Sequence, residues 1–188
     1  MERPSPMLKV LGIVAVLVLL VAAGILVYAA TKPNDFRVQR SASIKAPPER
    51  IYALIVDLHG WAAWSPYEKK DPAMKRTFSG AASGKGAVYE WDGDKNVGAG
   101  RMEIVDATPS SKIAIKLDFL KPFEGHNTAE FAMIPSGVPS GDGTKVTWAM
   151  YGPSSYMMKV MGTFMNMDRM IGDDFAAGLA NLKTIAEK

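Results

Sequence analysis

Ionisable side chains in strand-like segments are the residues of this sequence best suited to acid–base chemistry. The candidates are Glu90, Asp92, Arg101, Glu103 and Glu130. Any of them facing the protein interior would be a buried charge, which is costly without a partner and therefore informative about function. Alternation along a strand separates the two faces of a sheet but does not tell which face is buried. The sequence therefore leaves open whether any of these residues takes part in proton transfer.

Histidine, cysteine, serine and glycine add little to this inventory. His59, in a predicted turn, and His126, at the start of a predicted strand, have no neighbour at metal-ligand spacing. The absence of cysteine excludes a disulfide framework, a Cys-ligated metal and a cysteine nucleophile. No serine lies in a nucleophile-elbow motif, and the glycines between residues 80 and 100 lack phosphate-loop and dinucleotide spacing. We expect no metal and no other cofactor.

Methionine is concentrated between Ser155 and Gly172, in the stretch SYMMKVMGTFMNMDRMIG. Methionine is flexible and polarisable, so it suits irregular cores as well as surfaces that adapt to a bound apolar molecule. Three interpretations follow: ordinary core packing, the wall of a cavity, or an exposed lip near a membrane formed by Tyr156, Met157 and Met158.

The segment from Val10 to Ala30 contains no charged residue and reads VLGIVAVLVLLVAAGILVYAA. As a helix it would span about 30 Å, which is the thickness of the hydrocarbon core of a bilayer. A cleaved signal peptide is the alternative, but its apolar region is normally about 7 to 15 residues long. The sequence predicts an N-terminal tail at 1–9, a single-pass membrane anchor at 10–30 and a tether at 31–35. The side of the membrane on which the following domain lies is left open.

The charge of the chain argues against nucleic acid as a partner. The formal net charge is +3, and residues 1–32 carry +2 of it, so the rest of the chain is nearly neutral and has no basic stripe. The mixed-charge run EKKD at 68–71 is expected to be solvated surface.

The elements after the tether begin with a strand, since apolar and polar residues alternate from Phe36 to Ile44. Pro47 and Pro48 end this strand and start a short helix that runs to about Asp57, and a second helical piece covers 59–64. Short runs typical of strands then follow near 75–80, 87–92, 98–106, 112–119, 126–135 and 144–151. Their short connections favour an antiparallel meander.

The C-terminal segment is predicted to form one long helix. Apolar residues recur there at steps of three or four, namely Val160, Phe164, Met167, Ile171, Phe175, Leu179 and Leu182. A sheet of this kind hides its apolar face by curling around such a helix. The predicted class is α+β: a curved antiparallel seven-stranded sheet around a long C-terminal helix, plus one N-terminal transmembrane helix.

Four segments carry a resemblance to a known superfamily: IKAPPERIYALIVDLHGWAAWSPYEKKDP, SGKGAVYEWDGDKNVGAGRMEIVDATP, GDGTKVTWAMYG and DDFAAGLANLKTIAEK. Together with the element order they resemble the START-like, helix-grip superfamily (SRPBCC, or polyketide cyclase/dehydrase and lipid transport) over residues 36–188. The segment from Ser136 to Ser140 looks longer than the usual hairpin of this group. The resemblance implies a cavity between the sheet and the long helix, in a fold that hosts binding proteins, transporters and some enzymes.

The residues expected to line that cavity are apolar. They are Trp61, Trp64, Trp91, Met102, Ile104, Val146, Trp148, Met150, Met161, Phe164 and Met165. For the two tryptophans near the short helices, stapling those helices onto the sheet is an equally good interpretation.

The resulting hypothesis is membrane-anchored binding or transport of an apolar small molecule or lipid. The alternative is a polyketide cyclase/dehydrase-type enzyme that acts on a hydrophobic substrate and needs an inward acid or base. A protein-interaction module that docks a partner through the methionine segment is a third reading, and the sequence does not identify such a partner.

Overall fold

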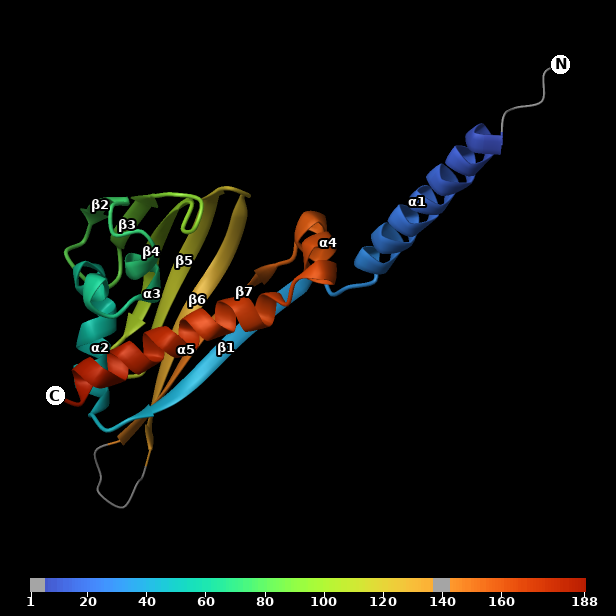
Figure 1. Ribbon diagram of the computed structural model, residues 1–188. Helices are drawn as coiled ribbons and strands as arrows, with labels where there is room; N and C mark the ends of the chain where they lie inside the picture. The colour runs from blue at the N-terminus through green and yellow to red at the C-terminus, as the bar shows by residue number, and fades with distance from the viewer. Residues whose placement is uncertain (1–5, 137–142) are drawn as a thin grey trace. The chain divides into compact units, whose positions relative to one another are not determined.

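The computed structural model describes residues 6–136 and 143–188 (Figure 1). Its chain divides into two compact units. The first joins the N-terminal segment through Asn34 with Ser154–Asn166, and the second consists of Asp35–Pro153 and Met167–Lys188. The segment from Ser136 to Ser140 lies, apart from its first residue, outside the described residues, as do residues 1–5 of the predicted tail.

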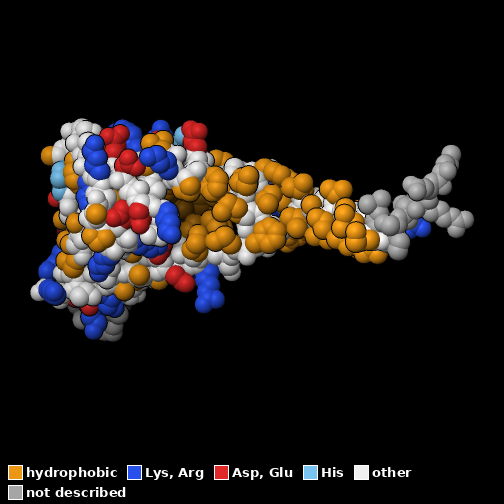
Figure 2. Space-filling model, turned by 45° about the horizontal axis from the view of Figure 1, so that its top comes forward, with side chains coloured by type: hydrophobic (Ala, Val, Ile, Leu, Met, Phe, Trp, Pro, Cys, Tyr) orange, Lys and Arg blue, Asp and Glu red, His pale blue; other side chains and the backbone are white. Residues whose placement is uncertain are grey.

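The first unit contains two helices, α1 (Pro6–Ala30) and α4 (Tyr156–Phe164). Within α1, the 22 residues Lys9–Ala30 are long and apolar enough to cross a membrane, and the most apolar part of this stretch is not buried at all by the protein. In Figure 2 the side chains over α1 are almost all hydrophobic. A helix with an apolar surface all round is typical of a membrane span, although a signal sequence has the same properties.

The second unit is built on a seven-stranded antiparallel sheet with the order β1-β7-β6-β5-β4-β3-β2. The strands are β1 (Asp35–Ile44), β2 (Lys75–Gly80), β3 (Ala87–Asp92), β4 (Ala99–Thr108), β5 (Lys112–Lys121), β6 (Gly125–Ser136) and β7 (Gly143–Pro153). Strands β2 to β7 form a meander, and β1 pairs with the last strand, β7. The predicted strands are thus confirmed, with ends that differ by no more than about two residues.

Helices cover one face of this sheet. They are α2 (Pro48–Val56), the 3₁₀ helix η1 (Leu58–Ala63), α3 (Pro66–Lys70) and the long α5 (Met167–Ala186). Pro48 stands in the first turn of α2, where its missing N–H costs no hydrogen bond. Helix α5 crosses the sheet and contacts β1, β7, α2 and α3 (Figure 1). The predicted helix-grip architecture is confirmed.

Three features differ from the expected elements, the first of which is the short helix α3, which was not predicted. The predicted long C-terminal helix is broken after Phe164, because Met165 takes an extended conformation (φ −127°, ψ 136°). The apolar stripe continues across the break, so the spacing alone did not reveal it. In addition, the run 68–71 is not simply solvated surface: Glu68, in α3, is 9% exposed and belongs to the interior.

Candidate functional site

An aromatic cluster fills the space between the sheet and α5. Trp148 on β7 stacks on Phe175 of α5, with ring centroids 4.2 Å apart, and on Phe131 of β6 at 4.9 Å. Trp61 lies in η1 and Trp64 follows its last residue. Both approach the Trp148 indole edge-on, with ring centroids 6.4 Å and 5.7 Å away. All five are at least 94% buried. Three predicted site residues are thus brought together, and they form the centre of the core.

The N–H groups of these indoles are not equally satisfied. Trp61 Nε1 donates to the Ile55 carbonyl at 2.8 Å and Trp64 Nε1 donates to the Leu54 carbonyl at 3.1 Å. These bonds staple η1 onto α2. Trp148 Nε1 is buried and has no hydrogen-bond partner among the described residues. An unsatisfied buried donor costs free energy. Trp148 Nε1 is therefore an unpaired hydrogen-bond donor inside an otherwise apolar cluster.

The remaining strand candidates share the inner face with Trp148. Met102, Ile104, Val146 and Met150 are each at least 94% buried. Trp91, on β3, is half-buried, and its indole N–H donates to the Val97 carbonyl at 3.1 Å. Half-buried apolar residues that pack against the core continue the inner face around Trp91: Val97, Leu117 and Phe119.

The three methionine-segment candidates belong to the other unit. Met161 and Phe164 lie on α4, and Met165 follows directly. Phe164 is 69% exposed and Met165 is 46% exposed. Their assignment to a cavity wall stays a prediction.

A buried polar network that the sequence analysis missed joins α3 to the sheet. The Glu68 carboxylate accepts a hydrogen bond from the Tyr89 hydroxyl at 2.7 Å and one from Arg76 Nε at 2.7 Å. Tyr89 and Arg76 lie on the inner faces of β3 and β2. Burial, and then the hydrogen bond to Glu68, raise the pKa of Tyr89 well above its usual range, so the phenol stays protonated. A signal was available in Tyr89, which by alternation shares a strand face with the predicted cavity residue Trp91, but the charged run that holds Glu68 gave no such signal.

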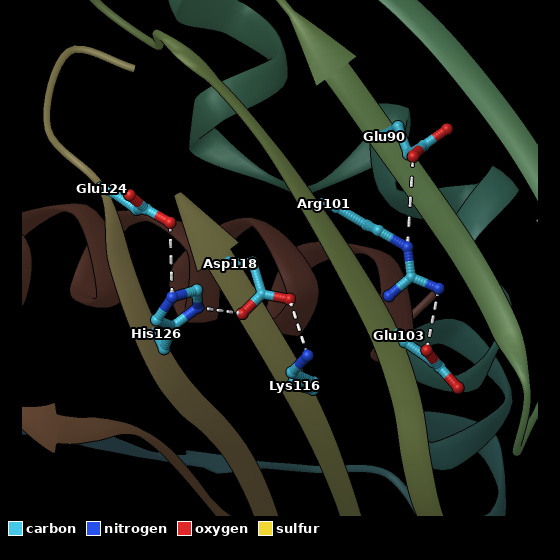
Figure 3. Close-up of polar contacts among 7 residues, drawn as sticks. All are labelled: Glu90, Arg101, Glu103, Lys116, Asp118, Glu124 and His126. Atoms are coloured by element: carbon cyan, nitrogen blue, oxygen red, sulfur yellow. Dashed lines mark hydrogen bonds and ion pairs between the residues drawn. The ribbon is translucent and has the colours of Figure 1, made fainter. Parts of the chain in front are cut away.

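Glu90, Arg101 and Glu103 lie on the outer face of the sheet, away from α5 (Figure 3). Asp92 and Glu130 lie on the same face, because their neighbours Trp91 and Phe131 point towards the core. Arg101 is flanked there by Glu90 at 4.0 Å and Glu103 at 2.8 Å. The register places Glu90, Arg101, Asp118 and His126 side by side across four strands. Asp92 pairs with Lys121 at 3.1 Å, and Glu130 accepts from the Tyr151 hydroxyl at 3.5 Å. Glu90, Arg101, Glu103 and Asp92 are therefore ion-paired at the surface, whereas Glu130 is hydrogen-bonded to a neutral hydroxyl and Asp118 is only 8% exposed.

His126 belongs to the same surface. Its Nδ1 lies 2.7 Å from the Asp118 carboxylate, which also pairs with Lys116 at 3.0 Å (Figure 3). Burial alone would raise the pKa of Asp118, but the hydrogen bonds with His126 and Lys116 outweigh burial and lower it. His59 stacks on Phe78 and contacts Asp57 at 3.2 Å. Within the described part of the chain, no three His, Asp or Glu residues are grouped as metal ligands.

A comparison with models of known protein families identifies the family to which this chain belongs. The family model described as polyketide cyclase / dehydrase and lipid transport matches residues 35–187. The chain belongs to this family. A search of curated proteins found no match.

Solved structures of low sequence identity share the fold of this chain. The protein CV1439 from Chromobacterium violaceum is 16% identical, with a TM-score of 0.55 over 83% of this chain and 99% of its own. The Aha1 dimer from Colwellia psychrerythraea is 17% identical, with a TM-score of 0.55 over 81% and 96%. The di-domain ARO/CYC StfQ from the steffimycin biosynthetic pathway is 12% identical, with a TM-score of 0.58 over 81% of this chain and 51% of StfQ. The resemblance stated from the sequence is confirmed at the level of family and fold.

Proposed function

We propose that this member of the polyketide cyclase / dehydrase and lipid transport family binds or transports an apolar small molecule or lipid between its sheet and α5, while α1 tethers it to a membrane. The observation that carries the proposal is the separation of side chains by face. Apolar and aromatic residues line most of the inner face, whereas four of the five charged candidates (Glu90, Asp92, Arg101 and Glu103) are ion-paired on the outer face. A mostly apolar interior with few polar groups is what small apolar ligands require.

We propose that the ligand enters at half-buried residues on the inner face. Trp91 lies on β3 and Leu117 and Phe119 lie on β5, with β4 between them, and all three pack against the core without being covered completely. Tethering is physically sensible because an apolar ligand partitions into the bilayer, so an anchored protein need not capture it from water.

Native mass spectrometry of the full chain in nanodiscs of one synthetic phospholipid tests the binding. We expect an adduct that differs in mass from the nanodisc lipid. The matched variants are Leu117→Lys, on the inner face of β5, and Leu120→Lys, on the same strand but 58% exposed. A lysine on the inner face places a charge against the apolar ligand, so Leu117→Lys should lose most of the adduct and Leu120→Lys should keep it.

Thermal unfolding of the two variants is the control for folding. Wild-type protein without any adduct would contradict the proposal, and so would a folded Leu117→Lys variant with the wild-type amount of adduct.

The alternative function is a polyketide cyclase/dehydrase-type enzyme, and the Tyr89–Glu68–Arg76 network favours it. This network is the buried acid on the inner face that such chemistry would need, and Tyr89 stays protonated as a donor. The adduct distinguishes the two functions when wild type and Tyr89→Phe are compared by mass. A binding protein carries the same molecule in both, whereas an enzyme accumulates unconverted substrate only in Tyr89→Phe.

A further inference from the structure

Helix α4 is fixed to the C-terminal end of α1 and the residues that follow it by three side-chain hydrogen bonds inside the first unit. The Tyr156 hydroxyl donates to the Leu26 carbonyl at 2.8 Å. Lys159 Nζ donates to Asn34 Oδ1 at 2.6 Å, and Lys32 Nζ donates to the Gly162 carbonyl at 2.5 Å. Both ends of α4 are therefore held against residues 26–34.

The first of these bonds determines where α4 lies along the apolar stretch of α1. Leu26 lies inside the apolar stretch Lys9–Ala30, four residues before its end, which corresponds to about 6 Å along a helix. The Tyr156 hydroxyl thus reaches a carbonyl below the polar end of the stretch. Tyr28 is also near that end, with Lys32 Nζ 5.3 Å from its ring centroid. Tyrosine and lysine at this level are typical of the boundary between hydrocarbon and headgroups.

The side of α4 that faces away from these bonds is apolar. Met157, Met161 and Phe164 follow one another at spacings of four and three residues and so share one side of the helix, here called the α4 apolar face. Met157 is 55% exposed and Phe164 is 69% exposed. Lys159, on the opposite side, is buried by its contact with the N-terminal segment. Large apolar side chains left in water at this density mark an interaction surface.

We infer that α4 is an interfacial helix that inserts the α4 apolar face into the headgroup region of the same bilayer that α1 spans. The occupant of this face is the lipid surface, because α4 packs against α1 and is bonded to it at Leu26, inside the apolar stretch Lys9–Ala30. An amphipathic helix in this position buries its apolar side chains at the boundary between headgroups and acyl chains. The inference rests on the proposed membrane anchoring by α1.

Site-specific fluorescent labelling tests this placement in the full chain. The protein has no cysteine, so each introduced cysteine is unique. Phe164→Cys and Met157→Cys probe the α4 apolar face, Val18→Cys probes the middle of α1, and Ile134→Cys, 61% exposed on β6, probes solvent. Each variant is labelled with an environment-sensitive dye and reconstituted into phosphatidylcholine vesicles that carry a nitroxide either near the top or in the middle of the acyl chain.

We expect the α4 labels to be quenched severalfold more than the Ile134→Cys label, and more by the shallow nitroxide than by the deep one. The Val18→Cys label should respond more to the deep nitroxide. If Val18→Cys is quenched while both α4 labels behave like Ile134→Cys, the anchor stands and the interfacial role of α4 is wrong. If Val18→Cys is not quenched by either nitroxide, the membrane anchoring itself fails, and the inference fails with it.

Discussion

Replacing Glu68 by glutamine tests whether the buried network holds α3 against the sheet. Its carboxylate has two partners, the Tyr89 hydroxyl and Arg76 Nε, each at 2.7 Å, and its side chain is 8% exposed. Glutamine has nearly the same shape but no charge, and only one of its two terminal atoms accepts a hydrogen bond. One of the two donors therefore loses its acceptor, and Arg76 loses its counterion.

The structure sets the size of the effect. Breaking a buried ion pair by removing one partner costs about 3–5 kcal/mol. Arg76 is 26% exposed and also donates to the carbonyls of Pro72 and Met74, which reduces the penalty. We expect Glu68→Gln to lower the free energy of unfolding by about 2–3 kcal/mol. For Tyr89→Phe we expect the free energy of unfolding to fall by about 1.5 kcal/mol, the low end for a hydrogen bond to a charged group. The loss is smaller because the carboxylate keeps its ion pair with Arg76.

Urea unfolding of the full chain in phosphatidylcholine nanodiscs, followed by tryptophan fluorescence, measures both variants. The four tryptophans all lie between residues 61 and 148, so the signal reports on the second unit. In the double variant, the two costs should not add, because Tyr89 and Glu68 share one bond. The network would have no structural role if Glu68→Gln stayed within about 0.5 kcal/mol of wild type, the range of ordinary surface substitutions.

Two further predictions concern the ring cluster and the outer face. Trp148→Ala should lower the free energy of unfolding by about 3–5 kcal/mol in the same assay, because it empties the centre of the aromatic cluster, and a value near that of a surface substitution would contradict this packing. His126→Ala should raise the pKa of Asp118 in a carboxyl NMR titration. Because the folded-state pKa of Asp118 is lowered, its contribution is present above an unfolded pKa of about 4 and is lost as the pH falls through the folded value, so the variant should lose less stability in acid. An unchanged titration curve would show that Lys116 alone sets the pKa.

Local patterns were sufficient to predict most of the fold. Alternation and proline placement identified the seven strands and α2, since both act through the backbone of a few neighbouring residues. Helix α3 was missed because five residues carry too little periodicity. The break at Met165 was missed because an apolar stripe reports which side is buried, not whether the backbone stays helical.

The site was harder to predict than the fold, for a physical reason. Alternation left open whether Glu90 and Glu103 face the interior, because only the position of α5 distinguishes the inner face of the sheet from the outer face. The burial of Glu68 depends on partners 8 and 21 positions away in the chain, Arg76 and Tyr89. Such a contact leaves no trace in the charged run around Glu68, which has the composition of ordinary surface.

The pairing of β1 with β7 has a consequence for how the chain folds. Strands β2 to β6 pair only with sequence neighbours, so each hairpin can form soon after it is synthesised. β1 is the first strand to leave the ribosome, yet its partner ends at Pro153, more than a hundred residues later. Closing a loop of that length makes this step slow relative to local hairpin formation. Until β7 arrives, β1 has both edges unpaired, and aggregation through this strand competes with folding.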